Sequence, residues 1–192
     1  MPDSLGNPAA ATAVPFVYPL DEFYARSGLV LPKVERITGE EVPEPYRALL
    51  VHQNDMTPTL EGFHNSSIHL QILNSEQRGD FYFREVVLRL DESELPVEFG
   101  ANKIGLWLFA PKARQLILEE RLPLGRILQE CNVEHSTRPK AFFRVVSDEF
   151  ISRMLKIGAG TTLYGRKATI LDLQQRPLSE IVEILPLADK AR

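Results

Sequence analysis

Three charged side chains stand inside strongly apolar stretches and are the first candidates for chemistry: Arg84 in FYFREVVL, and Glu180 and Glu183 in PLSEIVEILP. An arginine that points into an interior offers a rigid fork of donors that can clamp a carboxylate. A glutamate in a partly apolar pocket has a raised pKa and can share a proton with a hydroxyl group. Each has an ordinary alternative. Arg84 and Glu85 face opposite sides of a strand, so either can be the one in solvent, and either glutamate can be a surface residue.

Three further residues combine a suggestive position with an equally ordinary explanation. Arg166 opens a basic pair in YGRK, which is typical of a solvated strand edge. Met56 in NDMTP stands where a helix breaks, a common place for a core-filling side chain. Gly125 in LPLGRIL precedes an apolar helical pattern. It marks either a plain helix start or a loop whose backbone N–H groups meet an anion.

The histidines and the cysteine do not form a recognisable metal or nucleophile motif. His64 and His69 are five residues apart, which is not the i, i+4 spacing of a helical zinc pair, and His52 and His135 stand alone. Cys131 has no motif around it. The chain also lacks a Gly-rich phosphate loop, a GxSxG elbow and an HExxH motif. The sequence therefore predicts neither a bound metal nor a cofactor.

The bulk composition is that of an ordinary globular chain. It has 192 residues, of which 44% are hydrophobic and 25% charged, enough for one domain with one core. The net charge of −4 gives no reason to expect nucleic acid as a partner, and no apolar run approaches the ~20 residues of a membrane span. A single cysteine fits a cytoplasmic location. The oligomeric state is left open.

The elements that must position these residues alternate between helical and extended patterns. Residues 1–14 are predicted to be a flexible tail, 15–45 an arm that packs on the domain, and 46–192 the domain itself. One helix is expected up to Asp55 and a second from Thr57 and Pro58. Further helices are expected at 113–120, after 122, and at 147–157 with Ser147 or Asp148 as N-cap. The predicted strands are 67–76, 81–90, 96–109, 138–146, 158–173 and 176–186. This order predicts an α+β fold with a mostly antiparallel sheet.

Five segments, read together and in order, resemble the chorismate pyruvate-lyase family, enzymes that release pyruvate from chorismate to give 4-hydroxybenzoate. The segments are NDMT at 54–57, REVVL at 84–88, PLGR at 123–126, LYGRK at 163–167, and the closing RPLSEIVEILP. The resemblance covers about 46 to 187. It implies a single antiparallel sheet flanked by helices, with the ligand enclosed under helical flaps.

The resemblance also implies roles for individual residues. Arg84 matches the arginine that binds the substrate carboxylate, and Met56 and Leu124 match residues that line the site. Thr57, Gly125 and Arg166 lie within the same matching segments and are expected to bind substrate. The catalytic residues are expected to be Arg84 and a glutamate of the last strand. No metal or cofactor is implied, and the implied partner is a small aromatic carboxylate such as chorismate or a hydroxybenzoate.

The last strand departs from the family pattern. The family glutamate stands four residues before a proline, but here Val182 occupies that position and Glu183 follows it. Because a shift of one residue turns a strand side chain to the opposite face, either a β-bulge re-aims Glu183 inward or the site lacks its acid. Glu180 is a second candidate. We select Glu183 as the acid.

Three functions therefore stay open. The first is a lyase that converts chorismate to 4-hydroxybenzoate, or a related lyase that acts on another chorismate-derived acid to give a 3-hydroxy product or a larger aromatic. The resemblance implies quinone synthesis, and aromatic secondary metabolism is equally compatible. The second is a binding protein without catalysis, which the valine at position 182 would favour. Its fold would resemble the effector-binding domain of UTRA-type bacterial regulators. A DNA-binding regulator is the third. The first 45 residues are too short and too Pro-rich for the winged helix of such a regulator, and the chain as a whole is acidic.

Overall fold

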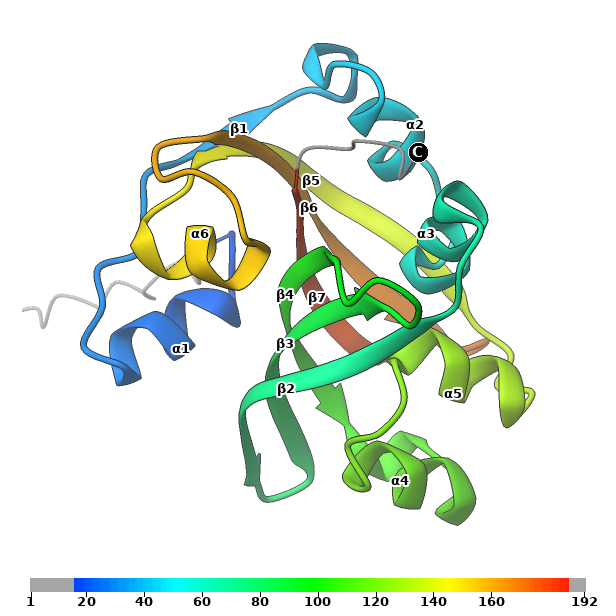
Figure 1. Ribbon diagram of the computed structural model, residues 1–192. Helices are drawn as coiled ribbons and strands as arrows, with labels where there is room; N and C mark the ends of the chain where they lie inside the picture. Colours follow the sequence, from blue (N-terminus) through cyan, green and yellow to red (C-terminus); the bar gives the residue numbers. More distant parts are fainter. Residues whose placement is uncertain (1–15, 187–192) are drawn as a thin grey trace, which may run out of the picture.

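The computed structural model describes residues 16–186, so the tail predicted at 1–14 lies outside the described residues. The described chain forms one seven-stranded antiparallel sheet in the order β1-β5-β6-β7-β4-β3-β2 (Figure 1). The strands are β1 (Val34–Ile37), β2 (Ile68–Arg78), β3 (Phe81–Leu90), β4 (Pro96–Gly105), β5 (Ser136–Val146), β6 (Thr162–Leu171) and β7 (Pro177–Leu185). The predicted α+β fold with a single antiparallel sheet and flanking helices is confirmed.

Helices cover both faces of this sheet (Figure 1). They are α1 (Leu20–Arg26), α2 (Tyr46–Leu50), α3 (Met56–His64), α4 (Pro111–Leu118), α5 (Leu124–Glu130) and α6 (Glu149–Leu155), with 3-10 turns η1 (Gly39–Glu41) and η2 (Leu106–Leu108). Asp148 is the N-cap of α6, and its carboxylate accepts a hydrogen bond from the Ile151 N–H. None of the helices within 16–186 is long and apolar enough to cross a membrane.

The alternation of side chains along the central strands divides the core into two layers. Phe83, Val87 and Val182 point to one face, where they pack with α1 and α6. The opposite face carries two separate apolar clusters, one under α2 and α3 and the other under α4 and α5. The polar residues of the strands face the gap between these two clusters, which makes this gap the place to look for a site.

The segment between α2 and α3 differs from the prediction of one helix running up to Asp55. The first helix ends at Leu50, residues 51–54 form bends, and the second helix begins at Met56. Arg166, from the distant strand β6, donates hydrogen bonds to the carbonyl oxygens of Leu50, His52 and Asn54. A continuous helix would have used these carbonyl groups internally, so a long-range contact decides where the helix breaks.

The N-terminal segment contributes directly to the sheet. From residue 16 it holds α1, β1 and η1, and β1 pairs antiparallel with β5, where Val34 lies opposite Val145. The side chains of Leu20 and Phe23 in α1 are buried against the sheet. This segment therefore completes one edge of the sheet and part of the core on the face opposite the polar gap.

Two glycines fix the position of β7 within the sheet. A Cβ atom at Gly100 on β4 would lie 2.3 Å from the carbonyl oxygen of Val182, and one at Gly165 on β6 would lie 2.4 Å from that of Glu183. Both distances are far below van der Waals contact, so these positions need glycine for close approach of the backbone. Strands β4 and β6 therefore approach β7 closely at Val182 and Glu183, the two residues between which the sequence analysis had to choose.

Candidate functional site

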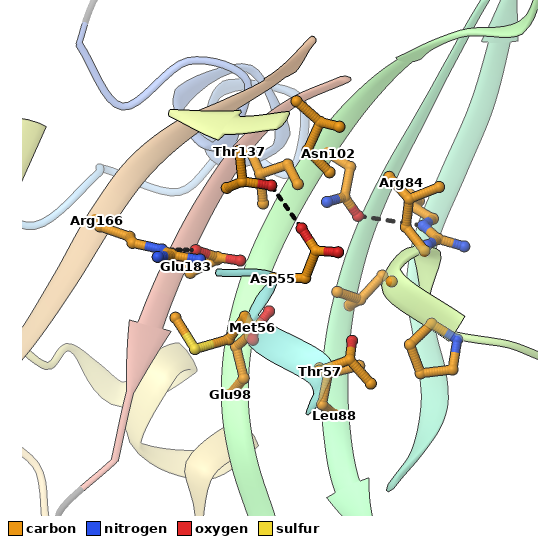
Figure 2. Close-up of a pocket in the computed structure, with 16 residues that line it drawn as sticks. Asp55, Met56, Thr57, Arg84, Leu88, Glu98, Asn102, Thr137, Arg166 and Glu183 are labelled. Atoms are coloured by element: carbon orange, nitrogen blue, oxygen red, sulfur yellow. Dashed lines mark hydrogen bonds and ion pairs between the residues drawn. The ribbon is translucent and has the colours of Figure 1, made fainter. Parts of the chain in front are cut away.

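A small cavity lies in the polar gap, between the central strands and the N-terminal turns of α3 and α5. Its volume is about 40 Å³, which is room for about three water molecules when one water needs roughly 10–15 Å³. It is lined by Asp55, Met56, Thr57, Arg84, Val86, Leu88, Glu98, Asn102, Pro123, Leu124, Gly125, Thr137, Arg166, Ile170, Ile181 and Glu183 (Figure 2). All seven residues that the sequence analysis assigned to the site line this cavity.

Arg84 is a buried cation with few hydrogen-bond partners among the described residues. Its side chain is 1% exposed, and its Nε donates a hydrogen bond to Oδ1 of Asn102 at 3.1 Å. Nη1 is buried and has no partner among the described residues. Burial lowers the pKa of Arg84 to about 10, which still leaves it charged at neutral pH. An unpaired buried cation is costly, so Arg84 is well placed to bind an anionic group that enters the cavity.

Glu183, and not Val182, faces the cavity. Val182 belongs to the core on the other face of the sheet, whereas Glu183 is 4% exposed and lines the cavity with Ile181. The pairing of β7 with β4 is regular from Ser179 to Ile184, and the register shift with β6 lies further back, near Pro177. Glu183 therefore reaches the cavity through regular alternation, without a bulge beside it. Glu180 does not line the cavity and pairs with Lys103 instead.

Glu183 and Arg166 form a buried ion pair on the side of the cavity away from Arg84 (Figure 2). The Nε of Arg166 lies 2.5 Å from Oε2 of Glu183, and the two side chains are 1% and 5% exposed. The remaining nitrogens of Arg166 reach the backbone between α2 and α3, as described above. Arg166 thus joins the acid of β7 to the segment that leads into α3.

Asp55 forms a second polar cluster at the start of α3, together with His135 and Thr137. Oδ2 lies 2.8 Å from Nε2 of His135, and Oδ1 accepts a hydrogen bond from the Thr137 hydroxyl at 2.5 Å. His135 Nδ1 lies 2.7 Å from the carbonyl oxygen of Val133. Because both ring nitrogens face acceptors, both bonds form only when the imidazole is protonated. Although Asp55 stands at the N-cap position of α3, its carboxylate is used for this cluster and not as a cap.

The ion pair between Asp55 and His135 should make stability depend on pH. The hydrogen bond with Asp55 raises the pKa of His135 above 6.5. Burial alone would raise the pKa of Asp55, but hydrogen bonds from His135 and Thr137 bring it below 3.8. A raised histidine pKa contributes stability that is complete below about pH 6.5 and lost as the pH rises through the folded value. A lowered aspartate pKa contributes stability that is complete above about pH 3.8 and lost on acidification.

The difference in Tm between wild type and His135→Gln should therefore be largest near pH 5 and shrink at pH 8 and above. A charged hydrogen bond of this kind is worth about 1.5 kcal/mol, or roughly 3–6 °C in a chain of this size. Thermal unfolding across this pH range measures the difference. The exposed pair of His69 and Asp91 supplies a control, since His69→Gln should change Tm little at any pH. An equal difference at pH 5 and pH 8.5 would contradict the prediction.

Gly125 brings the two helices over the cavity into close contact. A Cβ atom at this position would lie 3.1 Å from Oγ1 and 3.2 Å from Cβ of Thr57 on α3. The glycine in LPLGRIL therefore has a packing reason, which is the close crossing of α3 and α5. Met56 and Leu124, the first residues of these helices, are 4% and 5% exposed and close the cavity on that side.

Four polar residues of the cavity escaped the sequence analysis: Asp55, Glu98, Asn102 and Thr137. Asp55 was read only as a helix end, and Thr137 precedes the predicted strand. Glu98 and Asn102 lie in PVEFGANKIG, which was read as a strand without attention to its polar positions. The test applied to Arg84, a charge inside an apolar strand, would have found Glu98 as well.

The cavity unites two arginines, two glutamates and one aspartate in an interior of apolar walls. Arg166 is paired with Glu183, whereas Arg84 has no ion-pair partner among the described residues, so Arg84 is the cation that an added carboxylate could contact. Among the described residues, no group of three or more His, Cys, Asp or Glu side chains is arranged to hold a metal ion. The arrangement suits the binding of a small organic acid.

Comparison with known proteins places the fold but not a family. No family model matches the sequence, and no curated protein matches it. Among solved structures, PhnF from Mycobacterium smegmatis has a TM-score of 0.56 at 12% identity, over 74% of this chain and 67% of that one. The effector domain of the same protein has a TM-score of 0.52 at 11% identity, over 69% of this chain and 88% of that one. YydK from Bacillus subtilis has a TM-score of 0.51 at 6% identity, over 64% of this chain and 60% of that one. The chain therefore has the fold that UTRA-like and chorismate lyase-like domains have in common.

Proposed function

We propose that this protein binds a small aromatic carboxylate in the cavity and eliminates pyruvate from chorismate to give a hydroxybenzoate, with 4-hydroxybenzoate as the expected isomer. The observation that carries the proposal is the buried, unpaired Arg84 cation, which lines the same cavity as Glu183. A guanidinium group in an apolar cavity is a strong and selective site for one carboxylate. The order of the segments that resemble chorismate pyruvate-lyases adds the substrate class.

The proposed reaction needs positioning more than a reactive group. The bond that breaks is the ether between the ring and the enolpyruvyl group. The ring carbon that bears the hydroxyl group loses its proton, and the enolpyruvyl methylene gains one to become the methyl group of pyruvate. Aromatisation of the ring supplies the driving force. Arg84 would hold the ring carboxylate, and Glu183 would assist the movement of the proton.

A ligand with a six-membered ring requires the two helices over the cavity to move. The cavity has room for about three water molecules, which is less than such a ring occupies. The covering residues Met56, Thr57, Leu124 and Gly125 come from only two helix starts, α3 and α5. We propose that α3 and α5 act as flaps that separate on binding and then exclude water from the reaction.

The alternative is a binding protein of the same fold that performs no chemistry. The likeness to the PhnF effector domain favours it. So does the pairing of Glu183 with Arg166, because that ion pair already uses one of the two carboxylate oxygens of Glu183.

The two functions separate in one experiment. Purified protein is incubated with chorismate, and the appearance of an aromatic product is followed by absorbance and identified by chromatography, with Arg84→Ala and Glu183→Ala in parallel. We expect turnover in the wild type and its loss in both variants. Absence of turnover, combined with binding of 4-hydroxybenzoate that is lost in Arg84→Ala, would establish the binding protein instead. Absence of both would overturn the proposal.

A further inference from the structure

A second buried polar group without a partner lies in the same cavity as Arg84. Glu98 on β4 is 4% exposed, and its Oε2 atom has no hydrogen-bond partner among the described residues. Buried carboxyl oxygens are nearly always paired, so this one needs an explanation. Glu85 on β3 provides the contrast. It is 1% exposed on the opposite face of the sheet, and its Oε2 accepts a hydrogen bond from Asn74 at 2.7 Å.

Glu98 lies at one end of the cavity, and Asn102, which accepts a hydrogen bond from Arg84, lies at the other. Arg84 lies opposite Asn102 in the β3–β4 ladder, and Leu88 lies opposite Glu98. Four residues therefore separate Glu98 from Asn102, or roughly 13 Å along the strand at about 3.3 Å per residue. The residue between them on this face is Gly100, which has no side chain to fill the space. A single carboxylate group is too small to contact both Arg84 and Glu98. A longer molecule with a polar group at each end can contact both.

The protonation of Glu98 determines what it offers to such a molecule. Burial raises the pKa of Glu98 well above its ordinary value, and the neighbouring Glu183 raises it further. Arg166 and Arg84 lower the pKa of Glu98, but by less than the burial raises it. A raised pKa favours the neutral carboxylic acid form of Glu98, which can donate one hydrogen bond and accept another.

We infer that Glu98 is a specificity-determining residue that binds a hydroxyl group on the end of the ligand opposite the carboxylate held by Arg84. This inference rests on the proposed binding of an aromatic carboxylate and specifies a second polar group of that ligand. The favoured ligand is a rigid acid with a hydroxyl group across the ring. Glu98 thus forms the hydrogen bond with the hydroxyl group of the ligand, while Glu183 forms an ion pair with Arg166.

The test is calorimetric binding at pH 7 of 4-hydroxybenzoate, 3-hydroxybenzoate and benzoate to wild type, Glu98→Leu and Glu98→Gln. Glu85→Gln serves as the matched control, a buried carboxyl group on the other face of the sheet. We expect the wild type and Glu85→Gln to prefer 4-hydroxybenzoate over benzoate by about tenfold or more, the worth of one good hydrogen bond. Glu98→Leu should bind both acids equally. Glu98→Gln should keep most of the preference, because its amide still donates.

A second measurement covers the case in which Glu98→Leu does not fold. The infrared difference spectrum on addition of 4-hydroxybenzoate should contain a shifted carboxylic acid C=O band that is absent in Glu98→Gln. Preference for 4-hydroxybenzoate that survives in Glu98→Leu, or the lack of this band in the wild type, would overturn the inference while leaving the acid site of Arg84 in place. A wild type that binds none of the three acids would instead overturn the proposed function, and the inference with it.

Discussion

Arg84→Met is expected to weaken the binding of 4-hydroxybenzoate by about 100-fold to 1,000-fold, while leaving the folded protein as stable as the wild type or more stable. Removing one partner of a buried, hydrogen-bonded charge pair costs about 2–5 kcal/mol of binding free energy. Without ligand, the same guanidinium group is 1% exposed and forms no ion pair with a carboxylate in the part of the chain that the structure describes. Replacing it by an apolar side chain of similar length removes a desolvation penalty.

Opposite effects on binding and stability distinguish a ligand-binding arginine from a structural one. Calorimetric titration and thermal unfolding of the same preparations measure the two quantities. Arg89→Met is the matched control, since Arg89 lies on the same strand, bonds to Gln71, and does not line the cavity. Arg84→Lys should fall between wild type and Arg84→Met, because it keeps the charge but loses the fork of donors. A large loss of stability in Arg84→Met with unchanged binding would assign Arg84 to the core.

Much of the fold could be predicted because it depends on local patterns. The β-branched and aromatic content of FYFREVVLRL and the apolar pattern of RPLSEIVEILP predict β3 and β7. Residue type limits the N-cap of α6 to Ser147 or Asp148, and the structure shows that it is Asp148. The break between α2 and α3 was placed wrongly because it depends on Arg166, more than a hundred residues away in sequence. No window of neighbouring residues contains that information.

The site illustrates the same division between local and long-range information. Sequence reasoning could name Arg84 but could not decide whether Arg84 or Glu85 faced inward, because alternation fixes only that they differ. The answer depends on which face of β3 meets α3 and α5. For Glu183 the missing fact was the register of β7 between β4 and β6, which the close approaches at Gly100 and Gly165 determine. The roles of these residues in binding and catalysis stay predictions.

The cavity also explains why a site can be costly to the protein that carries it. Arg84 and Glu98 each bury a polar atom that has no partner among the described residues, which lowers the stability of the ligand-free protein. A ligand that bonds to both atoms would offset this destabilisation on binding. Arg166 and Glu183 already pair with one another, so this pair stabilises the structure without a ligand.

This pairing predicts a large loss of stability when Arg166 is replaced. Arg166→Met should lower the free energy of unfolding by about 3–5 kcal/mol, the usual cost of leaving one member of a buried ion pair alone. Tm should fall by roughly 6–20 °C for a protein of this size. The variant also leaves the carbonyl groups of His52 and Asn54 without their donor, so the segment that leads into α3 loses its anchor. Chemical denaturation and thermal unfolding measure the change.

The double variant Arg166→Met with Glu183→Leu separates the two causes. Removing both charges abolishes the unpaired carboxylate, so we expect it to regain more than half of the stability lost in Arg166→Met. What is not regained measures the anchoring of the segment between α2 and α3. Arg144→Met is the control, because Arg144 forms a two-pronged pair with Glu35 at 2.9 Å, with both side chains 50% exposed, and should cost less than about 1 kcal/mol. If Arg166→Met costs no more than this exposed pair, Arg166 does not hold the site together, and its hydrogen bonds are free to serve the ligand.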